Sequence, residues 1–300
     1  QGRNPLDANQ LSQRICGVCP ISHGIASSKC LEGAFGIKPN NNGRVLRNLM
    51  LAANYMHSHL IHFYHLAALD FVDITALLKY NGGDSRINNL KAWVESEVKT
   101  KKGRVDAITA GAPFLPRYEG SFYIKDVDTN IDAIAGYVKA LEIRMKAHKM
   151  VAAIGGRAPH AIGLVPGGVT QVPTRAMIRE YKKHIGDIEK FVNDVYMNHV
   201  IAVAKAFPDY FKIGSFTNFM SYGLFDQDLE DKKFFLQRGV AYGTKLEGLD
   251  AEKIREQVRY ARYSSGSNLH PYQGQTEPQP GKGGAYTWLK APRYDGKPME

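Results

Sequence analysis

The chain has 300 residues, of which 44% are hydrophobic, and this composition excludes collagen-like, disulfide-scaffold and wholly disordered proteins. Its 39 Lys and Arg outnumber its 29 Asp and Glu, which gives a formal net charge of +10. The basic residues are dispersed along helical stretches and form no long run of like charge. We therefore expect a solvated basic face and no nucleic-acid partner.

Apolar stretches in the chain are short, because charged residues such as Asp70, Lys79 and Asp194 interrupt them. None reaches the ~18 apolar residues of a spanning helix, so we expect no transmembrane segment. The first residues contain neither an initiator Met nor the apolar core of a signal peptide. We expect a single domain over residues 1–300 that forms the central part of a longer protein.

Two helices are predicted in the first third of the chain. Pro20 suits the first position of a helix over residues 20–35, which makes Cys19 its N-cap. Asn41 or Asn42 is predicted to cap a long amphipathic helix, which keeps its apolar period into the region of Asp70.

Two further long helices are predicted in the middle of the chain. Asn130 is expected to cap the third, which ends at Gly155-Gly156, and Pro173 to open the fourth, which ends at Pro208. After Pro208 we expect short strands and loops around one helix near 251–262, with a strand, a turn and a strand over 286–300. The predicted fold class is mainly α: a long-helix bundle with peripheral short strands and loops.

The sequence Cys16-Gly17-Val18-Cys19 is the main chemical motif, and His23 follows it by one helical turn. Two intervening residues let the two sulfurs converge on one metal ion. At a helix N-terminus, Cys19 is expected to gain thiolate character, and the positive charge of Arg14 acts in the same direction. His23 is expected to lie beside the same site.

Other uses of a Cys-x-x-Cys pair remain open. A structural zinc site usually needs four ligands, and no second pair of ligands with zinc spacing follows in this chain. A thioredoxin-like redox pair normally follows a buried strand, which residues 7–14 do not provide. The third alternative is a purely structural pair. The spacing favours metal binding over redox and structural use.

Four histidines and two aspartates on the second predicted helix are weaker candidates for a metal site or an acid/base pair. His59 and His62 could share an ion, and Asp70 and Asp73 could act as an acid/base pair. Packing histidines and solvated aspartates are the favoured alternatives, and Cys30 is expected to be a small buried residue. The four histidines are His57, His59, His62 and His65.

The segment Arg14-Ile15-Cys16-Gly17-Val18-Cys19-Pro20-Ile21-Ser22-His23 resembles the N-terminal metal-binding motif of nickel-iron hydrogenase large subunits, Arg-x-Cys-Gly-x-Cys-x-x-x-His. The resemblance continues through residues 62–71, 155–170 and 288–300. It covers essentially the whole chain in the order of the family.

Site roles follow from this resemblance. Cys16 would be a terminal nickel ligand and Cys19 a bridge between nickel and iron. His23 would act at the site by hydrogen-bonding a sulfur of the cluster. Arg293 corresponds to the arginine that lies over the diatomic ligands of the iron and is a candidate base for hydrogen activation, and Pro292 would help to wall that pocket.

The resemblance also implies a cofactor, a partner and a reaction. The cofactor is a Ni-Fe centre with CO and CN ligands on the iron, and Mg is a further candidate. The partner is a small subunit that holds the iron-sulfur clusters in a heterodimer. The reaction is the reversible heterolytic oxidation of H2 to protons and electrons, in a periplasmic or cell-envelope location.

Residues 1–300 also depart from the family pattern. The second Cys-x-x-Cys and the N-terminal proton-relay Glu of the family are absent, so we expect a fragment that is inactive alone. Ser58 stands where many members carry an acidic residue, and His160 is given no catalytic role. The rival interpretations are a related quinone-reductase subunit that lost the cluster, and a non-catalytic zinc-binding protein.

Overall fold

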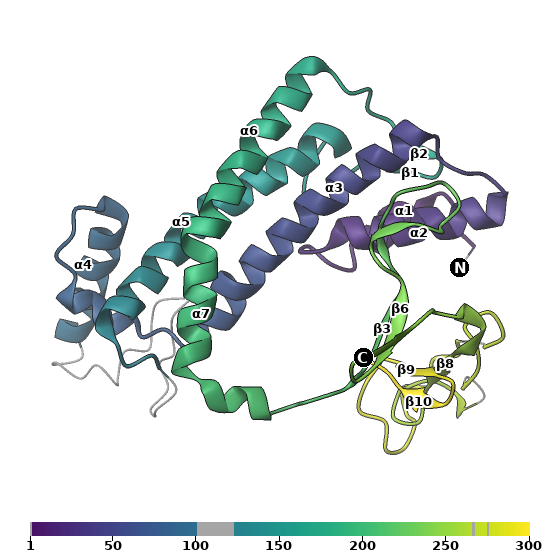
Figure 1. Ribbon diagram of the computed structural model, residues 1–300. Helices are drawn as coiled ribbons and strands as arrows, with labels where there is room; N and C mark the ends of the chain where they lie inside the picture. The colour runs from purple at the N-terminus through teal and green to yellow at the C-terminus, as the bar shows by residue number, and fades with distance from the viewer. Residues whose placement is uncertain (1, 101–122, 266–267, 275) are drawn as a thin grey trace. The chain divides into compact units, whose positions relative to one another are not determined.

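A computed structural model describes residues 2–100, 123–265, 268–274 and 276–300 (Figure 1). The chain forms two compact units, Gln1–Pro208 and Asp209–Glu300, which are described separately. The first unit is built of long helices and the second of short strands and loops, so the mainly α fold class is confirmed. The expectation of one domain over the whole chain stays a prediction.

The first unit begins with three helices, α1 (Asp7–Gln13), α2 (Pro20–Phe35) and α3 (Asn41–Leu60). Helix α2 has the predicted bounds, with Cys19 at its N-cap. Helix α3 is capped one residue earlier than expected, because Asn40 Oδ1 accepts a hydrogen bond from the Gly43 amide at 2.7 Å. Helix α1 was not predicted.

Helix α3 does not stop abruptly. It continues as a π-helical segment η1 (Ile61–Ala67) and a 3-10 turn η2 (Ala68–Asp70), which is followed by η3 (Ile74–Lys79) and α4 (Ser85–Thr100). The predicted apolar period therefore persists to Asp70, although the helical geometry changes along the way.

Helix α5 (Val127–Gly155) spans 29 residues. Its N-cap is Asp126, whose Oδ2 accepts a hydrogen bond from the Thr129 amide at 2.8 Å, so the prediction of Asn130 as the cap is wrong. Its end is as predicted, because Gly156 adopts a left-handed φ of 81° that glycine tolerates without strain. The short antiparallel strands β1 (Leu164–Val165) and β2 (Gly168–Val169) follow.

The fourth predicted helix is observed as α6 (Arg175–Phe191), a π-helical segment η5 (Val192–Tyr196) and α7 (Met197–Ala206), before the 3-10 helix η6 (Pro208–Lys212). It starts after Thr174, whose hydroxyl accepts from the Met177 amide, so Pro173 precedes the helix rather than opening it.

Helices α3, α5 and α6 lie side by side in the first unit (Figure 1). Part of the apolar stripe of each helix is buried against its neighbours, and a fully buried aliphatic side chain contributes roughly 1.5–3 kcal/mol. Fully buried members of this core are Met50, Ala53, Ile134, Ala140, Met150 and Ile188. Among the described residues, no helix has the length and apolar character needed to cross a bilayer.

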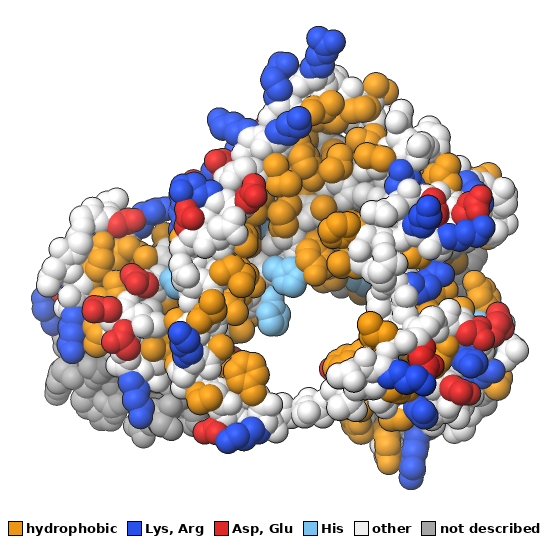
Figure 2. Space-filling model, in the orientation of Figure 1, with side chains coloured by type: hydrophobic (Ala, Val, Ile, Leu, Met, Phe, Trp, Pro, Cys, Tyr) orange, Lys and Arg blue, Asp and Glu red, His pale blue; other side chains and the backbone are white. Residues whose placement is uncertain are grey.

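Lys and Arg side chains are scattered over several helices and loops on the face shown in Figure 2, with Asp and Glu among them. Some of them form exposed pairs one helical turn apart, such as Lys190 with Asp194 at 2.6 Å. This distribution agrees with the expected solvated basic face.

The described residues of the second unit form three small antiparallel sheets. One is formed by β3 (Asn218–Ser221), β6 (Gly239–Tyr242) and β7 (Lys245–Glu247), and another by β4 (Leu224–Asp226) and β5 (Phe234–Leu236). The third has the order β10-β9-β8. Its strands are β8 (Ile254–Gln257), β9 (Ala291–Tyr294) and β10 (Lys297–Pro298).

The helix predicted near 251–262 is wrong. A single 3-10 turn, η7 (Ala251–Lys253), is followed directly by β8. The local residues favour a helix, but pairing of β8 with β9 satisfies the same backbone groups in a sheet, and tertiary pairing prevails over propensity. The predicted strand, turn and strand over 286–300 are confirmed by β9 and β10.

Candidate metal centre

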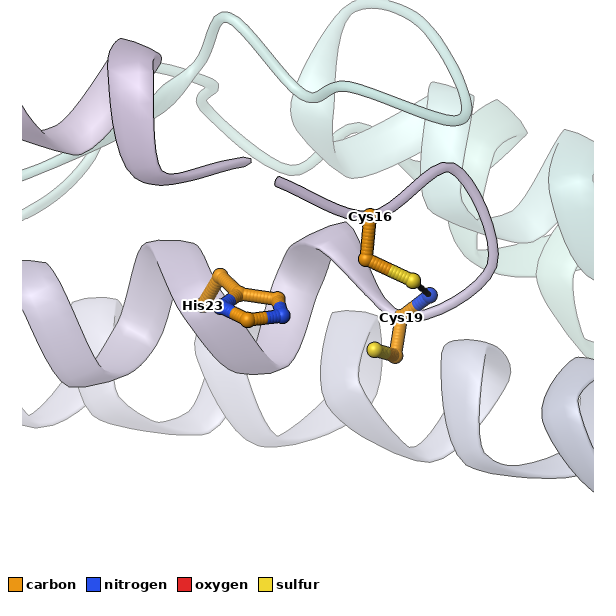
Figure 3. A group of neighbouring side chains, drawn as sticks. All are labelled: Cys16, Cys19 and His23. Atoms are coloured by element: carbon orange, nitrogen blue, oxygen red, sulfur yellow. Dashed lines mark hydrogen bonds between the residues drawn. The ribbon is translucent and has the colours of Figure 1, made fainter. Parts of the chain in front are cut away.

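The loop between α1 and α2 brings three potential ligands together. One ligand atom each of Cys16, Cys19 and His23 lies within 4.8 Å of the others, and all three residues are half-buried (Figure 3). It is the one group of three or more Cys, His or carboxylate side chains with this geometry in the part of the chain that the structure describes. The convergence inferred from the spacing is therefore present, whereas metal binding itself stays a prediction.

The two thiols have different surroundings. Cys16 Sγ accepts hydrogen bonds from the backbone amides of Val18 and Cys19, each at 3.3 Å. The hydrogen bond from the Cys19 amide is the main cause of the lowered pKa of Cys16. Burial, followed by the neighbouring Cys16, raises the pKa of Cys19, whose side chain makes no capping hydrogen bond. The thiolate preference expected for Cys19 thus belongs to Cys16, because the free amides at the helix start point at the earlier sulfur.

Arg14 was expected to favour the thiolate form of the cysteines through its positive charge, but its guanidinium makes other contacts. Its Nη1 donates to the Gln10 carbonyl at 2.7 Å and to Gln10 Oε1 at 2.9 Å. The guanidinium is therefore held against α1, and backbone amides rather than Arg14 account for the lowered pKa of Cys16.

A buried side chain of α3 holds the loop from the other side. Asn54 is 4% exposed, and its Oδ1 accepts from the Ile21 amide at 3.2 Å. Its Nδ2 donates to the Val18 carbonyl at 3.0 Å and to Ser58 Oγ at 3.1 Å. Asn54 therefore contacts the chain on both sides of Cys19.

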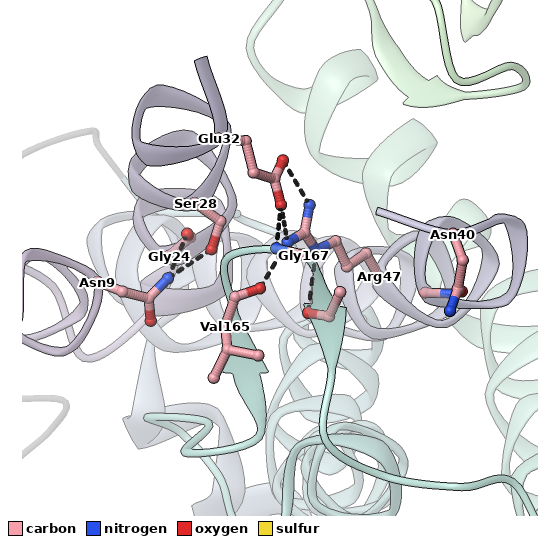
Figure 4. A network of polar contacts seen from close by, with 10 residues as sticks. Asn9, Gly24, Ser28, Glu32, Asn40, Arg47, Val165 and Gly167 are labelled. Atoms are coloured by element: carbon pink, nitrogen blue, oxygen red, sulfur yellow. Dashed lines mark hydrogen bonds and ion pairs between the residues drawn. The ribbon is translucent and has the colours of Figure 1, made fainter. Parts of the chain in front are cut away.

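A buried ion pair fixes the other end of α2 (Figure 4). Arg47 Nη1 donates to Glu32 Oε2 at 3.1 Å, and Arg47 Nε donates to the Gly168 carbonyl at 3.2 Å. The Gly167 amide donates to Glu32 Oε1 at 2.6 Å, and Val165 also accepts from Arg47. This network joins α2, α3 and the β1-β2 hairpin, and every contact within it is charge-assisted.

Helix α1 is fastened to α2 by buried amides. Asn9 Nδ2 donates to the Gly24 carbonyl at 2.8 Å and to Ser28 Oγ at 2.6 Å (Figure 4). Gln13 Nε2 donates to Asn9 Oδ1 and to the Ala161 carbonyl, each at 3.0 Å. Both ends of the cysteine loop therefore start from anchored helices.

Arg293 and Pro292 lie on β9 in the second unit. Arg293 pairs with Arg255 of β8 and with Pro298 of β10 in the sheet register. Its Nη1 donates to the Pro292 carbonyl at 3.0 Å, and it forms no ion pair with the residues that the structure describes. The following residue, Tyr294, is buried and its hydroxyl accepts from the Asp250 amide at 2.9 Å, so the strand is well anchored. The roles assigned to Arg293 and Pro292 stay predictions.

The weaker candidates fall into two groups. His59, His62 and Asp70 are exposed, and Asp73 caps η3 through the Thr75 amide at 3.0 Å. Cys30 is exposed, so its expected burial is wrong: it lies on the outer face of α2 with Ala26 and Gly33.

His57 and His65 pack against α5, as the favoured alternative predicted. His57 is 1% exposed and its ring stacks on His148 with a centroid distance of 4.0 Å. Burial, followed by His148 and Arg144, lowers the pKa of His57 to about 3. His65 Nε2 lies 3.3 Å from the Tyr137 carbonyl.

A model of the nickel-dependent hydrogenase family matches residues 1–300 of the chain. The chain belongs to this family. The predicted resemblance to nickel-iron hydrogenase large subunits is thereby confirmed.

Two relatives are similar to this chain over its whole length. The periplasmic NiFeSe hydrogenase large subunit of Desulfomicrobium baculatum is 38% identical over 311 positions, which cover 100% of this chain and 54% of that protein. The quinone-reactive Ni/Fe-hydrogenase large chain of Wolinella succinogenes is 33% identical, with coverages of 100% and 59%.

A solved structure of the Ni-Fe-Se hydrogenase from D. vulgaris Hildenborough has a TM-score of 0.83 and 39% identity, and the match covers 100% of this chain and 56% of that chain. This nickel-dependent hydrogenase chain thus spans a little over half the length of its relatives.

Sequence reasoning missed the side chains that support the cysteine loop of this hydrogenase chain. Asn54 and Arg47 lie on α3 among mostly apolar buried residues, and both are themselves buried. A polar residue on the core face of an amphipathic helix is the signal that could have indicated a buried polar network. The sequence alone does not identify the partners, which lie on α2 and on the β1-β2 hairpin.

Proposed function

We propose that the chain is part of the large, catalytic subunit of a nickel-iron hydrogenase, which oxidises H2 reversibly and heterolytically to protons and electrons. The observation that carries the proposal is the convergence of Cys16, Cys19 and His23 within 4.8 Å in a member of the nickel-dependent hydrogenase family. The names of its relatives as hydrogenase large subunits support the same function.

The donor set fits a nickel-iron centre. Two thiol sulfurs are soft ligands of the kind that suit nickel, and Cys16 already receives two amide hydrogen bonds that favour its metal-binding thiolate form. Cys16 would hold nickel terminally and Cys19 would bridge nickel and iron. When bound, such a centre, with CO and CN on its iron, supplies the redox-active metals at which H2 is split.

Three further residues would assist at this centre. His23 lies one helical turn beyond Cys19 and would donate a hydrogen bond to a sulfur. Arg293 forms no ion pair in the described part of the chain, so its guanidinium would be available as a fixed donor to anionic ligands or as the base. Pro292 would wall the same pocket. The described residues provide no second ligand group, and we assign no Mg ligands among them.

The proposed partner is a small subunit that carries iron-sulfur clusters and receives the electrons. The words "large subunit" and "large chain" in the names of the relatives support a partner of this kind. A periplasmic or cell-envelope location is also proposed, because the relative from Desulfomicrobium baculatum is named as a periplasmic enzyme.

The full-length protein, purified with its partner, provides the test. We expect H2-dependent reduction of a viologen dye, together with infrared bands of iron-bound CO and CN. Quinone reduction without H2 uptake would support the quinone-reductase alternative instead. A protein that binds only zinc and lacks these bands would support the zinc-binding alternative.

A further inference from the structure

We infer that Asn54 is a positioning residue that sets the geometry of the cysteine loop and thereby the metal affinity of Cys16 and Cys19. The inference deepens the proposed function, because it concerns the same candidate metal site. It rests on the contacts of one buried amide, which belongs to α3 and lies outside the cysteine motif.

One peptide plane connects Asn54 to Cys16. The Val18 carbonyl, which accepts from Asn54 Nδ2 at 3.0 Å, and the Cys19 amide, which donates to Cys16 Sγ at 3.3 Å, belong to the same peptide group. Since this group is planar, its C=O and N–H point in opposite directions and rotate together. By holding the carbonyl, Asn54 aims the amide at the first sulfur.

The second contact of Asn54 fixes the start of α2. Asn54 Oδ1 accepts from the amide of Ile21, which is one of the first-turn amides that have no partner within the helix. The backbone is therefore held immediately before and two residues after Cys19. Rotation of Cys19 away from Cys16 would break at least one of these hydrogen bonds.

Ser58 determines which way the amide of Asn54 points. Ser58 Oγ accepts the second N–H of Asn54 Nδ2 at 3.1 Å, so both donors and the acceptor of the side chain are used. A reversed amide would place its oxygen against the Val18 carbonyl and its donors against the Ile21 amide. The buried side chain consequently has a single favourable orientation.

Asn130 provides a matched control. It is 2% exposed and makes the same kind of contacts in the same unit, accepting from the Asp73 amide at 2.8 Å and donating to the Ile124 carbonyl at 2.6 Å and the Asp126 carbonyl at 2.8 Å. None of these partners belongs to the cysteine loop. Loss of this amide should affect folding stability without affecting the sulfurs.

The experiment compares Asn54→Leu with Asn130→Leu in the full-length protein. Leucine has the same branched skeleton of side-chain heavy atoms as asparagine, so each variant removes the hydrogen bonds and keeps the shape of the side chain, and the two variants share the same increase in volume. Outer partners of metal ligands typically contribute about 10–100-fold to metal affinity. We expect Asn54→Leu to weaken Co²⁺ binding to the metal-free protein by about that factor and to change the nickel EPR signal of the holoenzyme, whereas Asn130→Leu lowers the melting temperature alone.

Wild-type Co²⁺ affinity in Asn54→Leu, or an equal loss in Asn130→Leu, would overturn the inference. If Asn54→Leu does not fold, Ser58→Ala, which removes only the acceptor that orients the amide, should weaken Co²⁺ binding to a smaller extent, and an unchanged affinity there would also overturn it. A wild-type holoprotein without nickel would contradict the proposed function, while the Co²⁺ comparison would still decide the role of Asn54.

Discussion

Glu32 on α2 and Arg47 on α3 form a buried, two-pronged ion pair in which Arg47 Nη1 donates to Glu32 Oε2 at 3.1 Å. Polar atoms of the two side chains also bind the backbone of Val165, Gly167 and Gly168 in the β1-β2 hairpin. A buried pair of charges is stable only when its hydrogen-bonding capacity is used in this way. The pair thus joins α2, the helix that Cys19 caps, to the rest of its unit.

Removing one partner of this pair should be strongly destabilising. Arg47→Met leaves the Glu32 carboxylate buried without its counter-charge, and changes of this kind cost about 3–5 kcal/mol of unfolding free energy. Urea unfolding of the full-length protein measures the effect. Lys190→Met, which breaks an exposed pair with Asp194, is the control and should leave the urea midpoint unchanged. Equal effects of the two variants would show that the Glu32-Arg47 pair has no special role.

Gly24 is required by close packing on α2. A Cβ at this position would lie 2.7 Å from Leu164 Cδ2 and 3.0 Å from Gln13 Cγ. Gly24→Ala should therefore destabilise the protein by about 1–3 kcal/mol through overpacking. Gly33→Ala on the same helix meets no atom within 4 Å and should be stabilising by up to about 1 kcal/mol, because Ala is the better helix former. Thermal melts of both variants test the prediction, and stabilisation by Gly24→Ala would contradict it.

Stability should fall as the pH drops below the usual histidine range. The pKa of His57 is lowered from 6.5 to about 3 by burial, His148 and Arg144, so the folded state excludes a proton that the unfolded state binds. The stabilisation is complete above pH 6.5 and decreases toward about pH 3, by about 1.4 kcal/mol per pH unit for one such group.

The variant His57→Phe tests this pH dependence, because it keeps a ring against His148 but cannot be protonated. The loss of unfolding free energy between about pH 7 and pH 4 should be smaller in this variant than in the wild type. Part of the dependence of the unfolding free energy on pH should remain, since burial also lowers the pKa of His65 and of His148. A slope in His57→Phe that is identical to that of the wild type would show that His57 is protonated in the folded state.

Features that depend on neighbouring residues could be predicted from the sequence. The start of α2 follows from Pro20, and the convergence of Cys16, Cys19 and His23 follows from spacing along one loop and one helical turn. The left-handed end of α5 at Gly156 is likewise a local property.

Features that depend on distant contacts could not be predicted. Asn130 and Asp126 are both residue types that favour the N-cap. Asn130 is not the cap, because its side-chain amide binds the Asp73 amide and the Ile124 carbonyl. Strand β8 exists because β9 pairs with it. The support of the cysteine loop by Asn54 depends on how α3 packs against α2, and the spacing within the motif contains no information about that packing.

The nickel and iron contents of the purified full-length protein and of its Cys19→Ala and Cys30→Ala variants test most directly whether the cysteine loop holds a dinuclear centre. Both metals should be present in the wild type and in Cys30→Ala, whose exposed thiol lies outside the candidate site, and both should be lost in Cys19→Ala while the protein remains folded. Zinc in place of both metals in the wild type would contradict the nickel-iron centre, and unchanged nickel and iron in Cys19→Ala would contradict the assignment of Cys19 as a ligand.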